Sequence, residues 1–294
     1  MNENITILRR YYFPKMNVFR QYSTLNAFID QNSTLGLVPT MGALHQGHTS
    51  LIERALAEND QVIVTIFINP TQFEHSDDLK KYPKTLDSDI KMIRNISQKI
   101  IVYAPESSDL YSKSIKSSSY SFGSIENVME GKIRVGHFQG VATVVEKLLT
   151  IFLPTNAYFG EKDFQQLQII RSLVGQKNLS STIVGCSTCR NNNGLALSSR
   201  NSFLTKNETK KASFIFEQLK IAKSLWGVES SKFIIKKIKN SFSNNHDFKL
   251  DYFDIRYEKN LLNAENKSEN KVRAFIAVKL GKIRLIDNLP LYEF

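Results

Sequence analysis

Two apolar runs that enclose a glycine-containing loop and an amphipathic segment constrain this fold more than any other feature. The first run, LGLVP at residues 35–39, has the length of a buried strand, and the loop TMGALHQGH follows it. Apolar residues then recur at helical spacing over residues 49–59. Residues 61–69 (QVIVTIFIN) are β-branched and almost wholly apolar, as in a strand covered on both faces. The segment therefore predicts a βαβ unit with a right-handed crossover.

The same alternation continues along the chain to residue 184. It is carried by helical periodicity over residues 87–96, 141–152 and 162–174, which alternates with short apolar runs at residues 99–103, 156–159 and 181–184. Alternation of this kind predicts an α/β fold, specifically a Rossmann-like, doubly wound parallel sheet.

After residue 201 the pattern changes. Residues 206–226 and 229–242 predict helices, while residues 252–257, 272–280 and 283–286 predict strands; the polar stretch 262–271 predicts an exposed loop. We therefore expect a Rossmann-like domain followed by a smaller C-terminal α+β lid domain. The expected parts are an N-terminal extension (1–16), the Rossmann-like domain (17–188) and the lid domain (189–294).

The first 16 residues are basic and partly apolar, but they lack the apolar core and the cleavage site of a secretory signal. A transit peptide is the alternative, against which stand the acidic Glu3 and the absence of serine from this stretch. No apolar run in the chain is long enough to span a bilayer, so we expect no membrane partner.

The two cysteines, Cys186 and Cys189, form a C-x-x-C pair. Neither a second pair nor a histidine cluster lies nearby, which argues against a zinc site. The pair follows the apolar run at residues 181–184 and does not open a helix, which argues against a redox motif. We expect two free thiols in a reducing compartment, and hence a cytoplasmic protein.

The net charge of +11 allows two interpretations, an RNA-binding module or an enzyme with anionic substrates and lysine-rich surfaces. The lysines are spread along the chain. In the densest stretch, residues 232–239, apolar residues recur at helical spacing, which is typical of an amphipathic helix. No RNP motif or aromatic-interleaved basic strand is present, so we expect no nucleic-acid partner.

The strongest chemical signal is the run His45-Gln46-Gly47-His48 between the first strand and the first helix. Two imidazoles three residues apart at a helix start can project to the same side, where their N–H groups and the helix amides would hold phosphate oxygens. Gly47 leaves space for a nucleotide against the backbone. A metal pair or two surface histidines are the alternatives for a bare H-x-x-H. No dinucleotide or P-loop motif is present.

A second signal is the loop GLALSSRN at residues 194–201. Two serines followed by Arg200 can clamp phosphates, and the guanidinium can neutralise the β- and γ-phosphates as charge builds in the transition state. An ordinary loop is the alternative for this run alone. Together the two motifs resemble the signature loops of the adenylyl-transferring superfamily that includes class I aminoacyl-tRNA synthetases and nucleotidylyltransferases.

Longer runs resemble one family of that superfamily, the pantothenate synthetases (pantoate–β-alanine ligases). The likeness extends from about residue 17 to residue 291 in one order. The runs that carry it are PTMGALHQGHTSLI (39–52), FINPTQF (67–73), YPKTLDSD (82–89), GHFQGVATVVEKLL (136–149), YFGEKDFQQL (158–167), GLALSSRN (194–201) and RLIDNLPL (284–291).

The resemblance implies a homodimeric enzyme of coenzyme A biosynthesis that joins (R)-pantoate to β-alanine with ATP and Mg²⁺. Pantoate would first react with ATP to give pantoyl adenylate and pyrophosphate. The amine of β-alanine would then attack the activated carbonyl and release AMP and pantothenate. No covalent enzyme nucleophile is needed, because positioning and charge stabilisation supply the catalysis.

The resemblance also assigns residue roles, position by position. His48 would be the proton donor to the phosphates with His45 as its partner, and Lys162 and Arg200 would complete the catalytic set. Gln72 and Gln166 would bind the carboxylate and hydroxyls of pantoate, and Asp89 would belong to the Mg²⁺ shell. The ATP-binding residues would be Met41, Gly42, Ala43, Leu44, His45, Gln46, Gly47, His48, Gly160, Glu161, Lys162, Asp163, Cys189 (through its backbone), Leu197, Ser198, Ser199 and Arg200.

Several alternatives stay open at this point. Gln72 and Gln166 would also fit surface amides, and Lys162 with Asp163 would fit an exposed helical turn. Arg134 and His137, which the family would place near the active site, would equally fit a structural role. A nucleotidylyltransferase is the enzyme rival, because it shares H-x-G-H but joins two phosphates and needs no pair of amides facing a carboxylic acid.

Two departures from the family pattern affect loops. Val135 stands where the family usually has the proline of R-P-G-H-F. Asn191 and Asn193 stand where its R-E-x-D-G has carboxylates, which leaves open how Arg190 and the mobile loop are anchored. None of the residues assigned to phosphate or amide contacts is missing, so we expect an active enzyme.

Overall fold

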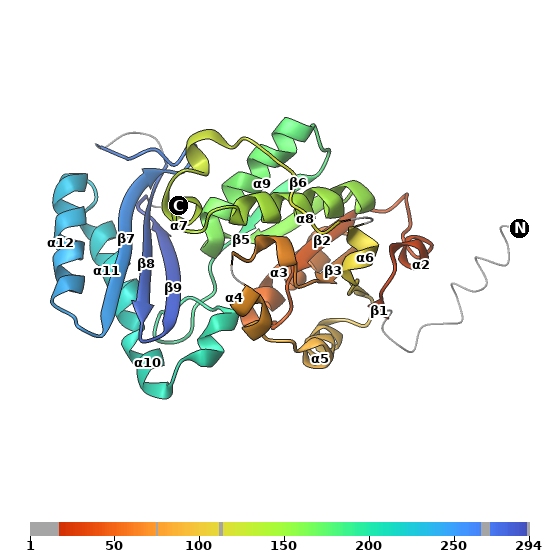
Figure 1. Cartoon of the computed structure of the whole chain (residues 1–294), viewed down its shortest axis with the longest axis horizontal. Coiled ribbons are helices and arrows are strands. Elements are labelled where there is room, and N and C mark those ends of the chain that lie inside the picture. Colours follow the sequence, from red (N-terminus) through yellow and green to blue (C-terminus); the bar gives the residue numbers. More distant parts are fainter. Residues whose placement is uncertain (1–17, 75, 112–113, 266–270, 293–294) are drawn as a thin grey trace, which may run out of the picture.

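The computed structural model describes residues 18–74, 76–111, 114–265 and 271–292. The expected N-terminal extension (1–16) and half of the expected polar loop (266–270 of 262–271) therefore lie outside the described residues. Figure 1 shows a larger part, in which helices surround a sheet, beside a smaller sheet that is backed by helices. No helix in the described ranges has the length and apolar character needed to cross a membrane.

A six-stranded sheet forms the centre of the larger part, in the order β1-β4-β3-β2-β5-β6. All of its pairings are parallel. This confirms the α/β fold expected from the sequence. The strands are β1 (Val18–Phe19), β2 (Leu35–Thr40), β3 (Gln61–Ile66), β4 (Ile101–Tyr103), β5 (Asn156–Gly160) and β6 (Thr182–Cys186).

Helices cover both faces of this sheet because its central strands are apolar on both sides. Leu37 and Ile63 are buried in a core that includes residues of α8 (His137–Phe152) and α9 (Phe164–Lys177). Their neighbours Val38 and Val64 belong to a second core, which includes residues of α3 (Gln46–Glu58) and α5 (Leu86–Ile96). Successive side chains of a strand point to opposite faces, so each central strand contributes to both cores. The sheet is doubly wound, as expected.

The strand order places two loops at the same edge of the sheet. The chain passes from β2 to β3 and β4 on one side and then returns to β5 on the other side of β2. The segments that follow β2 and β5 therefore leave the sheet side by side, at the point where the strand order reverses. In open α/β sheets, ligands bind at this point beyond the carboxyl ends of the strands.

The smaller sheet is antiparallel, in the order β7-β8-β9, and α11 and α12 share one hydrophobic core with it. This confirms the expected α+β character of the C-terminal segment, while the boundary at residues 188 and 189 stays a prediction. The elements are α10 (Lys206–Lys211), α11 (Ser213–Leu225), α12 (Ser231–Ser243), β7 (Phe248–Tyr257), β8 (Val272–Leu280) and β9 (Ile283–Pro290).

The single helix expected over residues 206–226 is two helices that meet at Ala212. The hydroxyl of Ser213 donates a hydrogen bond to the carbonyl oxygen of Lys210, and such side-chain bonds compete with the helical ladder. Short elements escaped prediction because they hold too few residues for a period to register. They are α2 (Tyr22–Asn26), α4 (Ser76–Lys81), α6 (Ser107–Leu110), α7 (Met129–Ile133) and the 3₁₀ turns at Pro70–Gln72, Gly123–Ile125, Glu161–Asp163 and Ser199–Phe203.

Candidate active site

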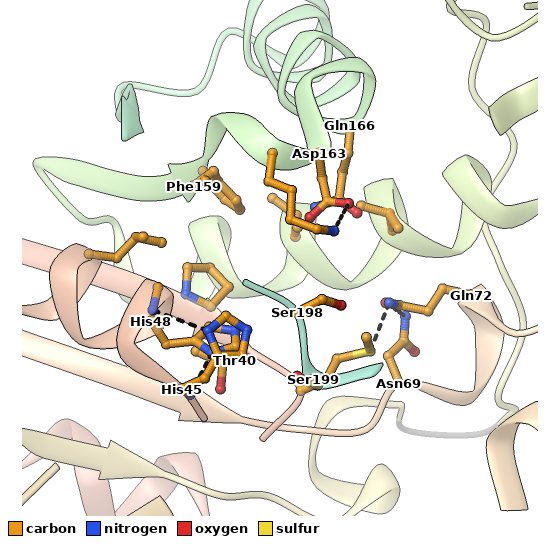
Figure 2. A pocket seen from close by; sticks show the side chains of 18 of the residues that line it. Thr40, His45, His48, Asn69, Gln72, Phe159, Asp163, Gln166, Ser198 and Ser199 are labelled. Atoms are coloured by element: carbon orange, nitrogen blue, oxygen red, sulfur yellow. Dashed lines mark hydrogen bonds and ion pairs between the residues drawn. The ribbon is translucent and has the colours of Figure 1, made fainter. Parts of the chain in front are cut away.

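A cavity of about 250 Å³ opens where the segments after β2, β3, β5 and β6 meet. Figure 2 shows His45 and His48 on one side of it, Asp163 and Gln166 on the opposite side, and Gln72 beside Asn69 at a third. Most of the residues that the sequence marked as functional line this cavity: Met41, His45, Gly47, His48, Gln72, Gly160, Lys162, Asp163, Gln166, Cys189, Leu197, Ser198, Ser199 and Arg200.

Six residues assigned to ligands are not among the described residues that line the cavity. Gln46 is exposed on the outside of α3, and Glu161 forms an ion pair of 3.2 Å with Arg273 of β8. The others lie in or beneath the backbone of the loop between β2 and α3 (residues 41–45), which is called the first loop below. They are Gly42, Ala43, Leu44 and Asp89.

His45 and His48 form a reciprocal pair of side-chain-to-backbone hydrogen bonds at the start of α3. The Nδ1 atom of His45 accepts a hydrogen bond from the backbone N–H of Gly47 at 3.1 Å. The Nδ1 atom of His48 accepts one from the backbone N–H of His45 at 3.2 Å, which closes a capping box. Since His45 is the cap, the helix begins at Gln46, earlier than the expected start at residue 49. Gly47 is needed here, because a Cβ atom would lie 2.9 Å from the His45 ring.

Burial sets the charge of both rings, and the capping sets their tautomer. Burial, and then the positive charge of Lys162, lowers the pKa of His45 from 6.5 to about 4. Burial, and then the His45 ring, lowers the pKa of His48 to about 3. Both rings are therefore neutral at pH 7, and because each Nδ1 accepts a hydrogen bond, the single proton of each ring is on Nε2. The site thus offers two neutral Nε2–H donors.

Asp89 does not fit the expected Mg²⁺ shell. Its carboxylate is buried and accepts hydrogen bonds from the backbone N–H groups of Ala43 (3.0 Å) and Leu44 (2.8 Å) and from the Thr85 hydroxyl (3.1 Å). Backbone amides that point at both carboxylate oxygens occupy the lone pairs that a metal would need. The sequence did not reveal this, because the carboxylate and its two backbone donors lie more than forty residues apart. The structure gives Asp89 the role of holding the first loop.

Lys162 and Asp163 extend from the 3₁₀ turn after β5. The Lys162 ammonium lies 3.5 Å from the Asp163 carboxylate. Burial pushes the pKa of Asp163 up, but the positive charges of Lys162, Arg200 and Arg134 outweigh it and lower that pKa. The cavity thus combines several cations with one ionised carboxylate, which is a suitable environment for a polyphosphate.

Gln72 is placed by its neighbour Asn69. The Gln72 side chain is buried, and its Oε1 atom accepts a hydrogen bond of 3.0 Å from Asn69 Nδ2. In the described part of the chain, the one hydrogen-bond partner of its Nε2 atom is the Met41 sulfur, at 2.8 Å. A thioether is a weak acceptor, so this N–H group is available to a ligand. The turn that carries Gln72 packs so closely on α8 that a Cβ atom at Gly140 would meet the Thr71 carbonyl.

Asn69 was missed by the sequence reasoning, although it lies in the quoted run FINPTQF. It is buried, donates to Gln72 and to the Gly140 carbonyl (3.1 Å), and accepts a hydrogen bond of 2.7 Å from the Tyr111 hydroxyl. An asparagine between an apolar run and a proline was the available signal, but it does not say which partners the side chain meets. Gln166 faces the same cavity, and its amide has no hydrogen-bond partner among the described residues.

Arg134 and His137 form a linked pair at the cavity edge. Burial, and then the charge of Arg134, lowers the pKa of His137 from 6.5 to about 4, so the ring is neutral. Its Nδ1–H group donates to the Gln72 carbonyl oxygen at 2.7 Å, which leaves Nε2 to accept from the Arg134 guanidinium at 3.0 Å. Within the described part of the chain, Arg134 has no carboxylate at ion-pair distance. A half-buried cation without a counter-ion is suited to an anionic ligand.

The loop after β6, which carries residues 189–201 and is called the third loop below, is anchored although Asn191 and Asn193 replace the carboxylates of the family pattern. Residues 189–197 form a small hairpin, in which the backbone N–H of Leu197 donates to the Cys189 carbonyl at 2.9 Å. Asn191 closes the turn through its Oδ1 atom, which accepts from the backbone N–H groups of residues 193 and 195, both at 3.0 Å. Arg190 pairs with Asp287 of β9. The neutral amide at residue 191 therefore suffices as an acceptor.

The end of this loop reaches back to the first loop. The Ser199 hydroxyl donates a hydrogen bond of 2.9 Å to the Ala43 carbonyl, and Arg200 forms an exposed ion pair of 3.3 Å with Asp78. The expected flexible run includes a 3₁₀ turn, Ser199–Phe203, capped by Ser198. Cys189 lines the cavity with its Sγ atom 3.2 Å from the Ser50 hydroxyl, and Cys186 ends β6; both are free thiols.

Comparison with known proteins shows which family the chain resembles over its length. The model of the pantoate–β-alanine ligase family matches residues 15–290. A pantothenate synthetase of Flavobacterium psychrophilum is 48% identical over 280 residues, which are 95% of this chain and 99% of the relative. One of Christiangramia forsetii is 46% identical over 281 residues, 94% of this chain and 99% of the relative.

Solved structures agree with these relatives. The crystal structure of pantothenate synthetase from Thermus thermophilus superposes with a TM-score of 0.89 at 34% identity, covering 95% of this chain and all of that one (100%). The structure of a pantoate–β-alanine ligase from Francisella tularensis, complexed with β-γ ATP and β-alanine, gives a TM-score of 0.76 at 36% identity. That match covers 94% of this chain and 98% of the other.

Proposed function

This chain belongs to the pantoate–β-alanine ligase family and is an ATP-dependent ligase that makes pantothenate; we propose that its one large described cavity binds all three substrates. The observation that carries this proposal is the pair of Nε2–H donors of His45 and His48, which share the cavity with Lys162 and Arg200. Neutral hydrogen-bond donors and cations that surround one cavity can bind the phosphates of ATP and stabilise the negative charge that develops on the pyrophosphate as it leaves.

On the phosphate side, the first and third loops bind ATP together. The helix start at Gln46 adds backbone N–H groups and a partial positive charge to the two histidines. His48, which the resemblance marks as a proton donor, acts here as a hydrogen-bond donor, because a ring with a pKa of about 3 carries no second proton at pH 7. The backbone of Cys189 borders the adenine.

Pantoate binds between Gln72 and Gln166. Each amide offers a donor and an acceptor, which suits a substrate that carries a carboxylate and two hydroxyls. Apolar side chains also line the cavity and would pack against the two methyl groups of pantoate; they are Phe67, Val141, Val144, Val145, Leu148 and Phe159. An analogue that lacks a hydroxyl would leave part of these amides without a hydrogen-bond partner, so the pocket rejects it.

For β-alanine, the unpaired Arg134 guanidinium is the carboxylate partner. The Nε2 atom of His137 accepts a hydrogen bond from this guanidinium, and the Nδ1–H group of His137 donates one to the Gln72 carbonyl oxygen. The second substrate is thereby tied to the same turn that positions pantoate. A carboxylate at Arg134 leaves the amine, at the other end of the molecule, free to approach the acyl carbon.

The reaction then follows in two steps. A carboxylate oxygen of pantoate attacks the α-phosphorus of ATP, and the bond from that phosphorus to the β-phosphate oxygen breaks, releasing pyrophosphate. The β-alanine amine next attacks the acyl carbon, loses a proton, and displaces AMP. Lys162, Arg200 and the two Nε2–H groups stabilise charge on the phosphates in the first step. No residue forms a covalent bond with substrate.

A Mg²⁺ ion accompanying ATP would be held mainly by phosphate oxygens and water, as is usual for this ion. Within the described residues no group of three or more potential metal-binding side chains exists, and Asp89 is occupied by amides. The carboxylate that fits a single contact is Asp163, which lines the cavity and is ionised. The ion would neutralise phosphate charge.

Three further expectations complete this proposal. A homodimer is supported by the family resemblance alone. A cytoplasmic location is supported by the two free thiols. The absence of a nucleic-acid partner is supported by the spread of the lysines along the sequence.

Product analysis separates this function from its enzyme rival. The ligase forms AMP and pantothenate in equal amounts, and only when pantoate and β-alanine are both present. A nucleotidylyltransferase joins two phosphates and releases no AMP in response to β-alanine. Detection of a pyrophosphate-linked dinucleotide in place of pantothenate would therefore reject the proposed function.

A further inference from the structure

Asn288 of β9, in the smaller sheet, holds the backbone of the 3₁₀ turn Glu161–Asp163, which is called the second phosphate loop below. Its side-chain amide donates hydrogen bonds to the carbonyl oxygens of Glu161 and Lys162, each at 2.9 Å. Its Oδ1 atom accepts a hydrogen bond of 2.6 Å from Arg273 of β8. Every polar atom of this buried side chain is therefore used, and water cannot replace the bonds if one is removed. The Lys162 backbone is fixed by a residue 126 positions away.

Asp287, the preceding residue, holds the root of the third loop. Its carboxylate accepts two hydrogen bonds from the Arg190 guanidinium, at 2.5 and 2.8 Å. Arg190 also donates to the Gly194 carbonyl at 3.0 Å, and its guanidinium lies over the Phe216 ring, 3.9 Å from the centroid. A planar cation bonded along its edge and stacked on its face has one orientation. The hairpin of residues 189–197 is thus tied to β9.

Two adjacent residues of one strand therefore anchor two loops that are far apart in the sequence. Successive side chains of a strand point to opposite faces, which lets one dipeptide reach both. Figure 1 shows β9 as the strand of the smaller sheet that lies nearest the larger part. Asp287 and Asn288 are not among the described residues that line the large cavity, so their influence on a bound nucleotide passes through Lys162 and Arg200.

We propose that Asp287 and Asn288 are positioning residues for adenylation, because they set the separation of the second and third phosphate loops. Lys162 and Arg200 then face the bound nucleotide at a fixed distance. This inference rests on the proposed function, which places ATP phosphates between these two loops. Ser199, which donates to the Ala43 carbonyl, links the same assembly to the first loop.

A double-mutant cycle on ATP binding tests the proposal directly. ATP affinity is measured by calorimetry, without pantoate, for Asn288→Ala, Lys162→Ala and the double variant. Asn288→Ala weakens ATP binding on the order of tenfold when Lys162 is present, and by less than about twofold when Lys162 is already alanine. Equal losses in both backgrounds would overturn the role, because Asn288 would then not act through Lys162.

A second cycle covers the other anchor. Asp287→Asn keeps the side-chain shape but removes the charge that Arg190 needs, and it is combined with Arg200→Ala. The adenylation rate falls on the order of a hundredfold in the single variant, as expected for a misplaced group. In the Arg200→Ala background, Asp287→Asn causes no further loss of rate. If the rate losses of the two single variants multiply in the double variant, Asp287 does not act by positioning Arg200.

Leu285→Ala is the matched structural control. Leu285 lies on the same strand and is buried in the core of the smaller sheet. Its truncation lowers the melting temperature but leaves ATP affinity and the adenylation rate within about twofold. Similar kinetic losses in Leu285→Ala and Asn288→Ala would show that only the stability of the sheet matters. If Asn288→Ala does not fold, Asn288→Ser enters the same cycle with the same criteria.

These measurements also separate this inference from the function on which it rests. A wild-type chain that binds ATP but performs no pantoate-dependent reaction would reject the proposed function, while the ATP-binding cycle would still decide the role of Asn288. An active wild-type chain whose Asn288→Ala variant keeps normal ATP affinity and rate would reject the positioning role alone.

Discussion

The Asp89 carboxylate accepts a hydrogen bond of 3.0 Å from the backbone N–H of Ala43, a residue held at a positive φ of 50°. Few residues other than glycine adopt this conformation without a compensating contact. A buried carboxylate below the first loop supplies that contact, and a second bond to the next N–H group strengthens it. The loop before the two histidines, to which the proposed function assigns ATP, is therefore held in one shape without a ligand.

Replacing Asp89 by asparagine tests this role against that of a metal ligand. The amide presents an N–H₂ group to at least one backbone N–H donor, so we expect the first loop to loosen and the KM for ATP to rise about tenfold. The Mg²⁺ concentration needed for half-maximal rate stays unchanged. A large shift in that Mg²⁺ requirement, with an unchanged KM for ATP, would restore the metal role.

His48 variants distinguish hydrogen bonding from proton transfer. His48→Ala removes the Nε2–H donor, and we expect the adenylation rate to fall on the order of a hundredfold. His48→Gln places an amide N–H₂ group near the Nε2 position and recovers part of this loss. The comparison is made by ATP–pyrophosphate exchange at saturating substrates. A glutamine variant as slow as the alanine variant would favour proton transfer by the ring.

Stability depends on pH through His137. Burial, and then the charge of Arg134, lowers the pKa of His137 to about 4, while the unfolded chain binds a proton near pH 6.5. The unfolded state therefore holds more protons between pH 6.5 and 4, and the free energy of unfolding falls as the pH falls through this window. The contribution of this ring amounts to at most about 3 kcal/mol.

Urea unfolding at a series of pH values measures this contribution. His137→Asn, which keeps a donor for the Gln72 carbonyl, makes the pH dependence between 6.5 and 4 less steep; His45 and His48, whose pKa values are also lowered, account for the slope that remains. The exposed His246 provides a control, and His246→Asn leaves the slope as it is in the wild type. Identical slopes for wild type and His137→Asn would refute the assignment.

Arg134 variants separate the two half-reactions. Arg134→Gln removes the cation assigned to the β-alanine carboxylate, so we expect the KM for β-alanine to rise on the order of a hundredfold. Pantoate-dependent exchange, which does not involve β-alanine, stays within about threefold of the wild type. Arg134→Lys recovers part of the affinity because it restores the charge. Loss of exchange with unchanged β-alanine affinity would place Arg134 on pantoate or ATP.

The sequence was informative where a local pattern sets the structure. Continuous apolar runs predicted the parallel strands, and the strand-to-helix position of His45 and His48 predicted their place at the carboxyl edge of the sheet. The details inside that loop were less accessible. The capping of α3 by His45, which decides the tautomer of both rings, depends on backbone geometry rather than on a residue pattern.

Long-range contacts explain the remaining differences. The family motif assigns Asp89 to a metal shell, since a carboxylate in a motif does not reveal that backbone amides of a distant loop saturate it. The sequence did not show the partners of Asn69 and Arg190 for the same reason. Asn69 donates a hydrogen bond to Gly140, 71 positions away, and Arg190 pairs with Asp287, 97 positions away. The lost carboxylates near Arg190 matter little, because β9 supplies its partner.

ATP–pyrophosphate exchange measured with and without pantoate, followed by addition of β-alanine, tests the central claim most directly. We predict exchange only when pantoate is present, and AMP accumulation only after β-alanine is added. Exchange that does not require pantoate, or no exchange by a folded chain that binds both ATP and pantoate, would contradict adenylation of pantoate in this cavity.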